Sequence, residues 1–164
     1  MNTESTKFKR VKVECETKGT LARLDSILQA VENNKNWVYS TKTAYRIKTN
    51  SKKDFIYYAE SAMPWPLENR DVVIHMLFNS DSIANMLFVT ASGEPDGFPR
   101  KTNIVRLPHF QGRYVATQKT SNQLNILYYL EIDPGGNTPA WLVNMFVAKG
   151  PYETFSKLAT MLQR

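Results

Sequence analysis

The sequence predicts an α+β fold in which a curved antiparallel sheet of about seven or eight strands wraps around a long C-terminal helix. Two observations lead to this prediction. Apolar and polar residues alternate over strand-length segments from residue 37 to residue 132, and short turns separate these segments. The pattern then becomes helical, and within residues 140–148 only Asn144 is polar. Because one side of a helix cannot hold so much apolar surface, we expect the sheet to enclose it.

The N-terminal part of the chain predicts one strand and one shorter helix. Residues 8–17 alternate between apolar and charged side chains, which is typical of a half-buried strand. Gly19 ends this strand, and Thr20 can cap a helix over residues 21–33. Apolar residues recur along that helix at spacings of three and four, namely Leu21, Leu24, Leu28 and Val31.

The middle of the chain predicts consecutive strands. Their expected bounds are residues 37–48, 55–63, 70–79, 85–92, 102–110, 113–119 and 123–132. Turns of hairpin length between most of them favour antiparallel pairing. Since helices occur only near the two ends of this order, the pattern indicates α+β and not alternating α/β.

The last helix begins after a turn-rich segment, residues 133–139. Thr138 is expected to cap the helix, with Pro139 at its first position, where a missing N–H costs nothing. Pro151 lies about twelve residues further on and should kink the helix near residues 147–150. Such a kink fits a hinge that admits a ligand and equally a helix that bends around a packed core.

Length and composition indicate one soluble domain over residues 1–164, with residues 1–7 as a flexible tail. No apolar run approaches the roughly 18 residues of a membrane span. The N-terminus lacks the apolar segment of a signal peptide, and the single Cys15 excludes an internal disulfide, so we expect a cytoplasmic location.

The formal charge of +6 is compatible with an anionic partner. The basic residues are mixed with acidic ones over most of the chain, which favours a merely solvated surface. Transient contact with an acidic membrane surface is the alternative, and no nucleic-acid partner is expected.

Three segments resemble the START domains, the lipid-transfer family related to the steroidogenic acute regulatory protein. Residues 65–76 (WPLENRDVVIHM) are similar to the family's Pro-x-x-x-Arg-Asp segment. Residues 105–118 contain its Val-Arg and Gly-aromatic pairs, and residues 125–146 contain Asp-x-x-Gly-x-x-Pro-x-x-Leu-x-Asn. Residues 149–151 continue the match, and all segments follow the family's order and spacing.

This resemblance implies the helix-grip fold, which is shared with pollen-allergen-like proteins and polyketide cyclases. It also implies a tunnel between sheet and helix that binds one hydrophobic molecule such as a phospholipid, sterol or fatty acid. Two departures are visible. The chain is shorter than most START domains, and Met76 stands where some sterol-binding members place a buried arginine.

The residues expected to line or gate this tunnel come from the strands, the last helix and the loop of residues 64–69. They are Trp65, Arg70, Ile74, Met76, Phe88, Leu107, His109, Val143, Val147, Phe155 and Leu158. His109 is the polar candidate inside the cavity, with a satisfied core or rim histidine as the alternative. Arg70 is either a ligand contact or an anchor for its loop, and the anchor is favoured.

Enzymatic motifs have little support in this sequence. No nucleophile elbow, phosphate-binding loop or dinucleotide fingerprint is present, and no metal site or cofactor is expected. A cyclase or aromatase on the same fold is the alternative to lipid binding. Its acid–base groups would be His109 together with Arg106 or a tyrosine.

Overall fold

The computed structural model describes residues 8–164, so the tail expected at residues 1–7 lies outside the described residues. Its main feature is one eight-stranded sheet. The strands are β1 (Lys9–Lys18), β2 (Thr41–Ser51), β3 (Asp54–Ser61), β4 (Asn69–Asp81), β5 (Met86–Gly93), β6 (Ile104–Arg106), β7 (His109–Thr120) and β8 (Gln123–Asp133).

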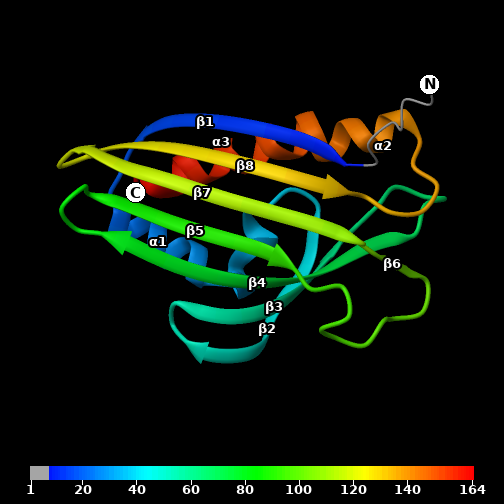
Figure 1. Cartoon of the computed structure of the whole chain (residues 1–164). Coiled ribbons are helices and arrows are strands. Elements are labelled where there is room, and N and C mark those ends of the chain that lie inside the picture. Colours follow the sequence, from blue (N-terminus) through cyan, green and yellow to red (C-terminus); the bar gives the residue numbers. More distant parts are fainter. Residues whose placement is uncertain (1–7) are drawn as a thin grey trace, which may run out of the picture.

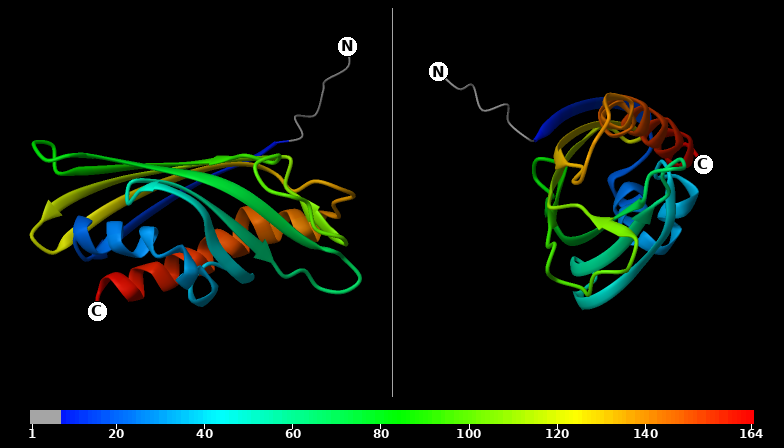
Figure 2. Two further views of the ribbon diagram at one scale, coloured as in Figure 1. Left: turned by 90° about the horizontal axis from the view of Figure 1, so that it is seen from below. Right: turned by 90° about the vertical axis from the view of Figure 1, so that its right-hand side faces the viewer.

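The order across the sheet is β1-β8-β7-β5-β4-β3-β2, with the short β6 paired to β4 off this path. Every pair along the path is antiparallel, whereas β6 runs parallel to β4. The first strand therefore lies beside the last one, as Figure 1 shows for β1 in blue and β8 in yellow. The strongly twisted sheet has a concave side on which the helices lie (Figure 2).

Two helical groups cover this concave side. The first consists of α1 (Leu21–Gln29) and the 3-10 helix η1 (Val31–Asn36). The second is the C-terminal helix, which is divided into α2 (Ala140–Asn144), the π-helical segment η2 (Met145–Lys149) and α3 (Gly150–Leu162). The predicted α+β fold, with a curved sheet around a long C-terminal helix, is confirmed.

The core is solid where α1 packs beside the end of α3. Leu24, Leu124, Leu158 and Leu162 are at most 3% exposed there. Gly19 lies against this cluster with φ +145°, a conformation that favours glycine, and a Cβ on it would lie 3.1 Å from the Cβ of Leu162. This end therefore holds the sheet and the C-terminal helix together.

The C-terminal helix begins differently from the prediction. The hydroxyl group of Thr138 does not cap it but donates to the carbonyl oxygens of Gly135 at 3.0 Å and Gly136 at 3.4 Å. Both glycines have positive φ, so the chain turns sharply before the helix starts at Ala140. The prediction that Thr138 caps the helix is wrong, because its hydroxyl group is bonded within this glycine turn and Pro139 precedes the helix instead.

The segment predicted as one strand over residues 102–110 is two strands. β6 ends at Arg106, and the N–H of Leu107 donates to the carbonyl oxygen of Asp71 at 2.9 Å. Pro108 has no N–H to donate, and β7 begins after it beside β5 and β8. The chain thus changes its neighbours at Pro108, and the alternation of faces does not continue across it.

Candidate functional site

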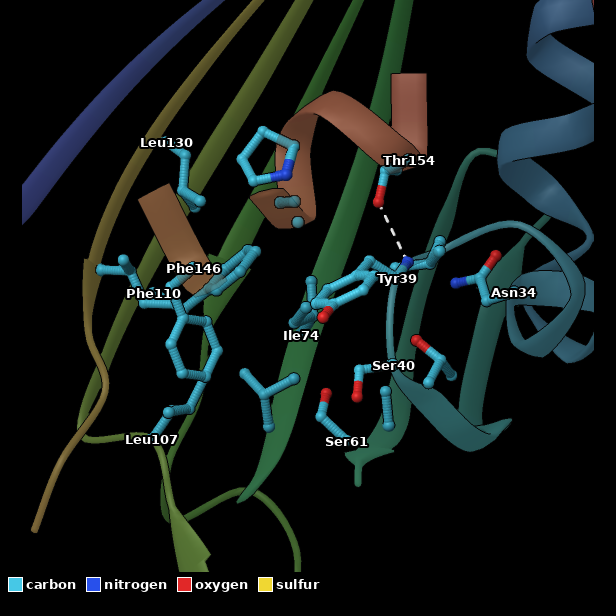
Figure 3. A pocket seen from close by; sticks show the side chains of 18 of the residues that line it. Asn34, Tyr39, Ser40, Ser61, Ile74, Leu107, Phe110, Leu130, Phe146 and Thr154 are labelled. Carbon is cyan, nitrogen blue, oxygen red and sulfur yellow. Dashed lines mark hydrogen bonds between the residues drawn. The ribbon is translucent and has the colours of Figure 1, made fainter. Parts of the chain in front are cut away.

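A cavity of about 180 Å³ lies between the concave side of the sheet and the helices. Its wall comes from β3, β4, β5, β7 and β8, from η1, from the segment between η1 and β2, and from η2 and α3. Figure 3 shows side chains from these elements pointing toward a common space. The cavity lies away from the solid leucine cluster, beneath the irregular part of the C-terminal helix.

The sheet side of the cavity follows from strand alternation. On β4, Val72, Ile74 and Met76 point inward, and Ile74 is paired with Tyr57 of β3. β5 contributes Ala91 to the same surface. Because neighbouring strands are in register, these inward side chains form one continuous apolar wall.

The helical side of the cavity has a π-helical turn. The N–H of Gly150 donates to the carbonyl oxygen of Met145, five residues earlier. Pro151 follows and has no N–H, so an ordinary helical bond is absent at this point. The wider turn places Met145 and Phe146 in the cavity wall (Figure 3 for Phe146). The sequence predicts a kink near residues 147–150, and the structure has this π-helical turn over Met145–Lys149.

The segment between η1 and β2 lies against this turn and covers the cavity. The backbone N–H of Tyr39 donates to Oγ1 of Thr154 on α3 at 2.9 Å (Figure 3). A Cβ on Gly150 would lie 3.2 Å from Cδ1 of Tyr39 and 2.5 Å from the carbonyl oxygen of Met145. Glycine is therefore needed where Tyr39 and the π-helical turn meet.

The polar groups of the wall are uncharged. Besides Tyr39 of the covering segment, three strand tyrosines line it, Tyr57 from β3, Tyr114 from β7 and Tyr128 from β8, and the rings of Tyr114 and Tyr128 are 4.6 Å apart. Burial raises the pKa of all three phenols, so they are neutral donors at ordinary pH.

Two polar atoms of the wall are buried without a partner. They are Oδ1 of Asn34 on η1 and Nε1 of Trp37 just after it. The two residues are only 7% and 2% exposed. Buried donors and acceptors are normally hydrogen-bonded, so unpaired ones beside a cavity indicate groups that a bound molecule could satisfy.

Several of the residues predicted for the tunnel lie in this wall. They are Ile74, Met76, Leu107 and Phe155. Leu158 is completely buried but belongs to the solid cluster. Val143 and Val147 are half-buried on the C-terminal helix and do not line the cavity, since the π-helical turn directs Met145 and Phe146 inward instead.

The prediction that His109 points into the cavity is wrong. His109 begins β7 after the break at Pro108, and it lies on the outer face of the sheet. There its Nε2 is 2.8 Å from Oε1 of Glu131, and its ring stacks on Phe8 at 4.2 Å. Phe110, its neighbour of opposite parity, lines the cavity in its place (Figure 3).

The prediction that Phe88 points inward is wrong for a related reason. Residues 86–89 are all apolar, so alternation gives no face for this strand. In the structure Leu87 and Val89 are buried, at 3% and 0% exposure, whereas Phe88 is 37% exposed.

Arg70 is a loop anchor and does not line the cavity. Its guanidinium is buried and donates to the carbonyl oxygens of Glu68 at 2.7 Å, Gly135 at 3.3 Å and Pro134 at 3.4 Å. These bonds tie the start of β4 to the turn that precedes α2. Trp65, in the adjacent loop, is 91% exposed and outside the cavity wall.

Arg106, an alternative acid–base candidate, is also used structurally. It forms a bidentate ion pair with Asp71, at 2.6 and 3.1 Å, in which both side chains are 1% exposed. It also donates to the carbonyl oxygens of Pro95, Phe98 and Pro99, at 2.8 to 3.2 Å. The pair therefore fixes the long connection between β5 and β6.

Reasoning from the sequence missed most polar residues of the cavity. Tyr57, Tyr114 and Tyr128 sit at inward positions of strands, and their parity could have identified them. Asn34 and Tyr39 carry no such signal, because they lie in segments predicted as a helix end and a strand. Their place depends on how η1 and the following segment pack under α3.

Known proteins are similar to this chain in sequence and in structure. The family model for the START domain matches residues 3–164. An uncharacterized protein of Pseudomonas aeruginosa, PA1579, is 24% identical over 161 residues, which cover 98% of this chain and 79% of that protein. The phosphatidylcholine transfer protein of Bos taurus is 24% identical over 128 residues, which cover 75% of this chain and 58% of that one.

A crystal structure has the same fold. It is a fragment of a STAR-related lipid transfer protein from Xanthomonas axonopodis, with a TM-score of 0.86 and 23% identity over 99% of this chain and 90% of that one. A curved antiparallel sheet wrapped around a long C-terminal helix defines the helix-grip fold. The chain belongs to the START domain family.

Among the helices of residues 8–164, none combines the length and apolar character needed to cross a bilayer. Over the same residues, His, Cys, Asp and Glu side chains do not gather in threes or more in a way that could hold a metal ion.

Proposed function

We propose that this chain binds one lipid molecule in the cavity and transfers it between membranes. The observation that carries the proposal is the apolar cavity itself, which lies between the concave side of the sheet and the C-terminal helix. Buried apolar surface of this kind contributes about 25 cal/mol per Å² to the binding of an apolar molecule. The similarity to a phosphatidylcholine transfer protein supports a lipid as the cargo.

Loading of the cavity requires movement of its cover. Its volume of about 180 Å³ is below the roughly 300–1,000 Å³ of typical ligand sites, so the cavity expands or takes a small lipid. The contact of Tyr39 with Gly150 and Thr154 lies directly over it. We propose that this contact opens when lipid enters, with the π-helical turn absorbing the change in the helix.

We further propose that the end of the molecule that carries the loop of residues 64–69 and α2 contacts membranes transiently. Figures 1 and 2 show these two segments at the same end. Trp65 is 91% exposed there, and Trp141 of α2 is 46% exposed. Indole rings prefer membrane interfaces, and the net charge of +6 favours an anionic surface. A cytoplasmic location stays a prediction.

Binding is favoured over a cyclase activity by the nature of the wall. Tyrosines are the titratable side chains that line the cavity, and burial raises the pKa of Tyr57, Tyr114 and Tyr128. His109 and Arg106, the acid–base candidates of the cyclase alternative, are engaged elsewhere. General acid–base chemistry near neutral pH needs groups whose pKa lies near that pH.

The proposal is tested by extraction of lipid from vesicles. The purified protein is incubated with vesicles of total bacterial phospholipid extract and 1-decanol, separated from them, and weighed by native mass spectrometry. We expect one added lipid mass per chain. Ala59→Trp, which fills the cavity wall, should abolish the added mass, whereas Ala84→Trp in the exposed β4–β5 turn should not.

Two results would contradict this function. One is the recovery of protein without any added mass. The other is equal lipid loading of Ala59→Trp and the unsubstituted chain, since the lipid would then be bound outside the cavity. Circular dichroism establishes that both variants are folded before they are compared.

A further inference from the structure

The cavity wall has no charged side chain among the described residues. Every polar side chain in it is a neutral hydroxyl, amide or indole group. Besides the tyrosines and the Asn34–Trp37 pair, these are hydroxyl groups at the rim, such as those of Ser40 and Ser61 in Figure 3. The absence of charged groups therefore restricts the head group of a ligand, whereas the apolar surface restricts only its hydrocarbon part.

The two buried arginines nearest in sequence to the wall are engaged by other parts of the chain. Arg70 directs its guanidinium to three backbone carbonyl oxygens. Arg106 directs its own to the carboxylate of Asp71 and to three other carbonyl oxygens. Neither lines the cavity. A phosphate or carboxylate inside it would therefore have no cationic partner.

Burial of a charged head group without a partner is strongly unfavourable, whereas an uncharged hydroxyl or carbonyl group needs only a hydrogen bond. The wall supplies such bonds in two places. Tyr57, Tyr114 and Tyr128 offer three neutral phenol donors, and burial keeps them protonated. Asn34 and Trp37 offer an amide and an indole group. Oδ1 of Asn34, an acceptor, and Nε1 of Trp37, a donor, are buried without a partner.

We infer that the cargo is an uncharged lipid with an alcohol or carbonyl oxygen, which is buried together with its chain and hydrogen-bonded by the tyrosines or by Asn34 and Trp37. This inference rests on the proposed function and names the class of lipid. It separates this chain from a carrier that buries a phosphate or phosphocholine group. The volume of about 180 Å³ favours a single hydrocarbon chain over two.

Three ligands with the same ten-carbon chain test the inference. They are 1-decanol, which is neutral, decanoate, which is anionic at pH 8, and decylphosphocholine, which is zwitterionic. Isothermal titration calorimetry at pH 8 and below the critical micelle concentration gives the three dissociation constants. We expect 1-decanol to bind at least about tenfold more tightly than either charged ligand.

The outcomes distinguish the inference from the function on which it rests. Decanoate or decylphosphocholine binding as tightly as 1-decanol would overturn the inference and leave lipid binding intact. Failure of all three to bind would overturn both. Tighter binding of decanoate as the pH falls toward the carboxyl pKa supports the inference, because the bound species is then the neutral acid.

The hydrogen-bonding groups are tested by substitutions that keep the rings. The triple variant Tyr57→Phe, Tyr114→Phe, Tyr128→Phe should bind 1-decanol about tenfold more weakly, and adding Asn34→Leu should weaken it further. Tyr129→Phe, on the outer face of β8 beside Arg113, is the matched control and should bind normally. Unchanged affinity in the triple and quadruple variants would refute these contacts. The comparison of the three ligands with the unsubstituted chain holds even where a variant fails to fold.

Discussion

Strand β4 connects two buried regions whose polar atoms differ in one respect. At its start, Arg70 and Asp71 belong to a charged cluster with Arg106, and carbonyl oxygens or a carboxylate receive the guanidinium donors. A few residues later, Ile74 and Met76 form the wall of a cavity whose polar groups are neutral. In the first region the guanidinium groups are bonded to carbonyl oxygens and a carboxylate of the chain, whereas in the second Oδ1 of Asn34 and Nε1 of Trp37 have no partner.

The two regions show that a conspicuous polar motif and a candidate binding group need not be the same residues. The Arg-Asp pair is the most conspicuous motif of the sequence, yet it fixes the turn before α2 and the connection between β5 and β6. The buried polar atoms of the wall that have no partner belong to Asn34 and Trp37, which no motif marks. Since buried polar atoms are normally paired, unpaired ones that also line a cavity are the better guide to a binding site.

The largest expected effect concerns the charged cluster. Arg106→Met leaves the Asp71 carboxylate buried without its partner, and loss of one partner of a buried pair costs about 3–5 kcal/mol. Urea unfolding measures the free energy of unfolding. Arg100→Met, which removes the exposed pair with Asp96, should cost at most about 0.5 kcal/mol. A loss below about 1 kcal/mol for Arg106→Met would show that the cluster is not a structural anchor.

The second effect concerns the cavity tyrosines at alkaline pH. Burial raises the pKa of Tyr57, Tyr114 and Tyr128, so above pH 10, the usual pKa of tyrosine, the unfolded chain loses protons that the folded chain keeps. Their contribution to stability is complete below pH 10 and falls by about 1.4 kcal/mol per pH unit for each tyrosine above it.

Unfolding of the unsubstituted chain and of Tyr128→Phe, measured from pH 9 to pH 12, tests this point. The two stabilities should change in parallel up to about pH 10, and the variant should then lose stability less steeply. Curves that remain parallel over the whole range would mean that Tyr128 also ionises in the folded chain.

The third effect concerns the cover of the cavity. Thr154→Val removes the acceptor for the N–H of Tyr39 and should cost about 1 kcal/mol in stability. Because this bond also holds the cover closed, stopped-flow measurements should show faster release of 1-decanol. Thr160→Val is the matched control on the exposed side of α3, where the hydroxyl only donates to Ser156 within the helix. Equal release rates for both variants would mean that the contact between Tyr39 and Thr154 does not control the opening of the cover.

The smallest effect concerns residues on the outer face of the sheet. His109→Ala and Phe88→Ala should leave the affinity for 1-decanol unchanged, with a difference below about 0.5 kcal/mol. Calorimetry measures both. Substantial loss of affinity in His109→Ala would mean that the ring turns inward and that the original prediction for this residue was right.

Periodicity was sufficient to predict the fold and its order of elements. Strict alternation along β1 and the double-sided apolar pattern of residues 140–148 have few structural solutions. Alternation failed where its physical basis was missing. Residues 86–89 are apolar on both faces, and Pro108 ends one strand and lets the next begin with the other parity.

The cavity wall was predicted only in part for a different reason. Ile74 and Met76 follow from the parity of β4, which is unbroken. Tyr39 and Phe146 depend on tertiary packing, because a non-repetitive segment must meet a π-helical turn whose position is set by Gly150 and Pro151. No local pattern in the sequence predicts the contact between these two segments.

The central claim is that the cavity holds lipid, and photo-crosslinking tests it most directly. The protein is loaded with a 1-decanol analogue that carries a diazirine on its chain, irradiated, digested and mapped by mass spectrometry. The account predicts adducts on wall residues such as Ile74, Leu107 and Phe146, and their loss in Ala59→Trp. Adducts concentrated on exposed Ile83 and Phe88, and unchanged in Ala59→Trp, would contradict it.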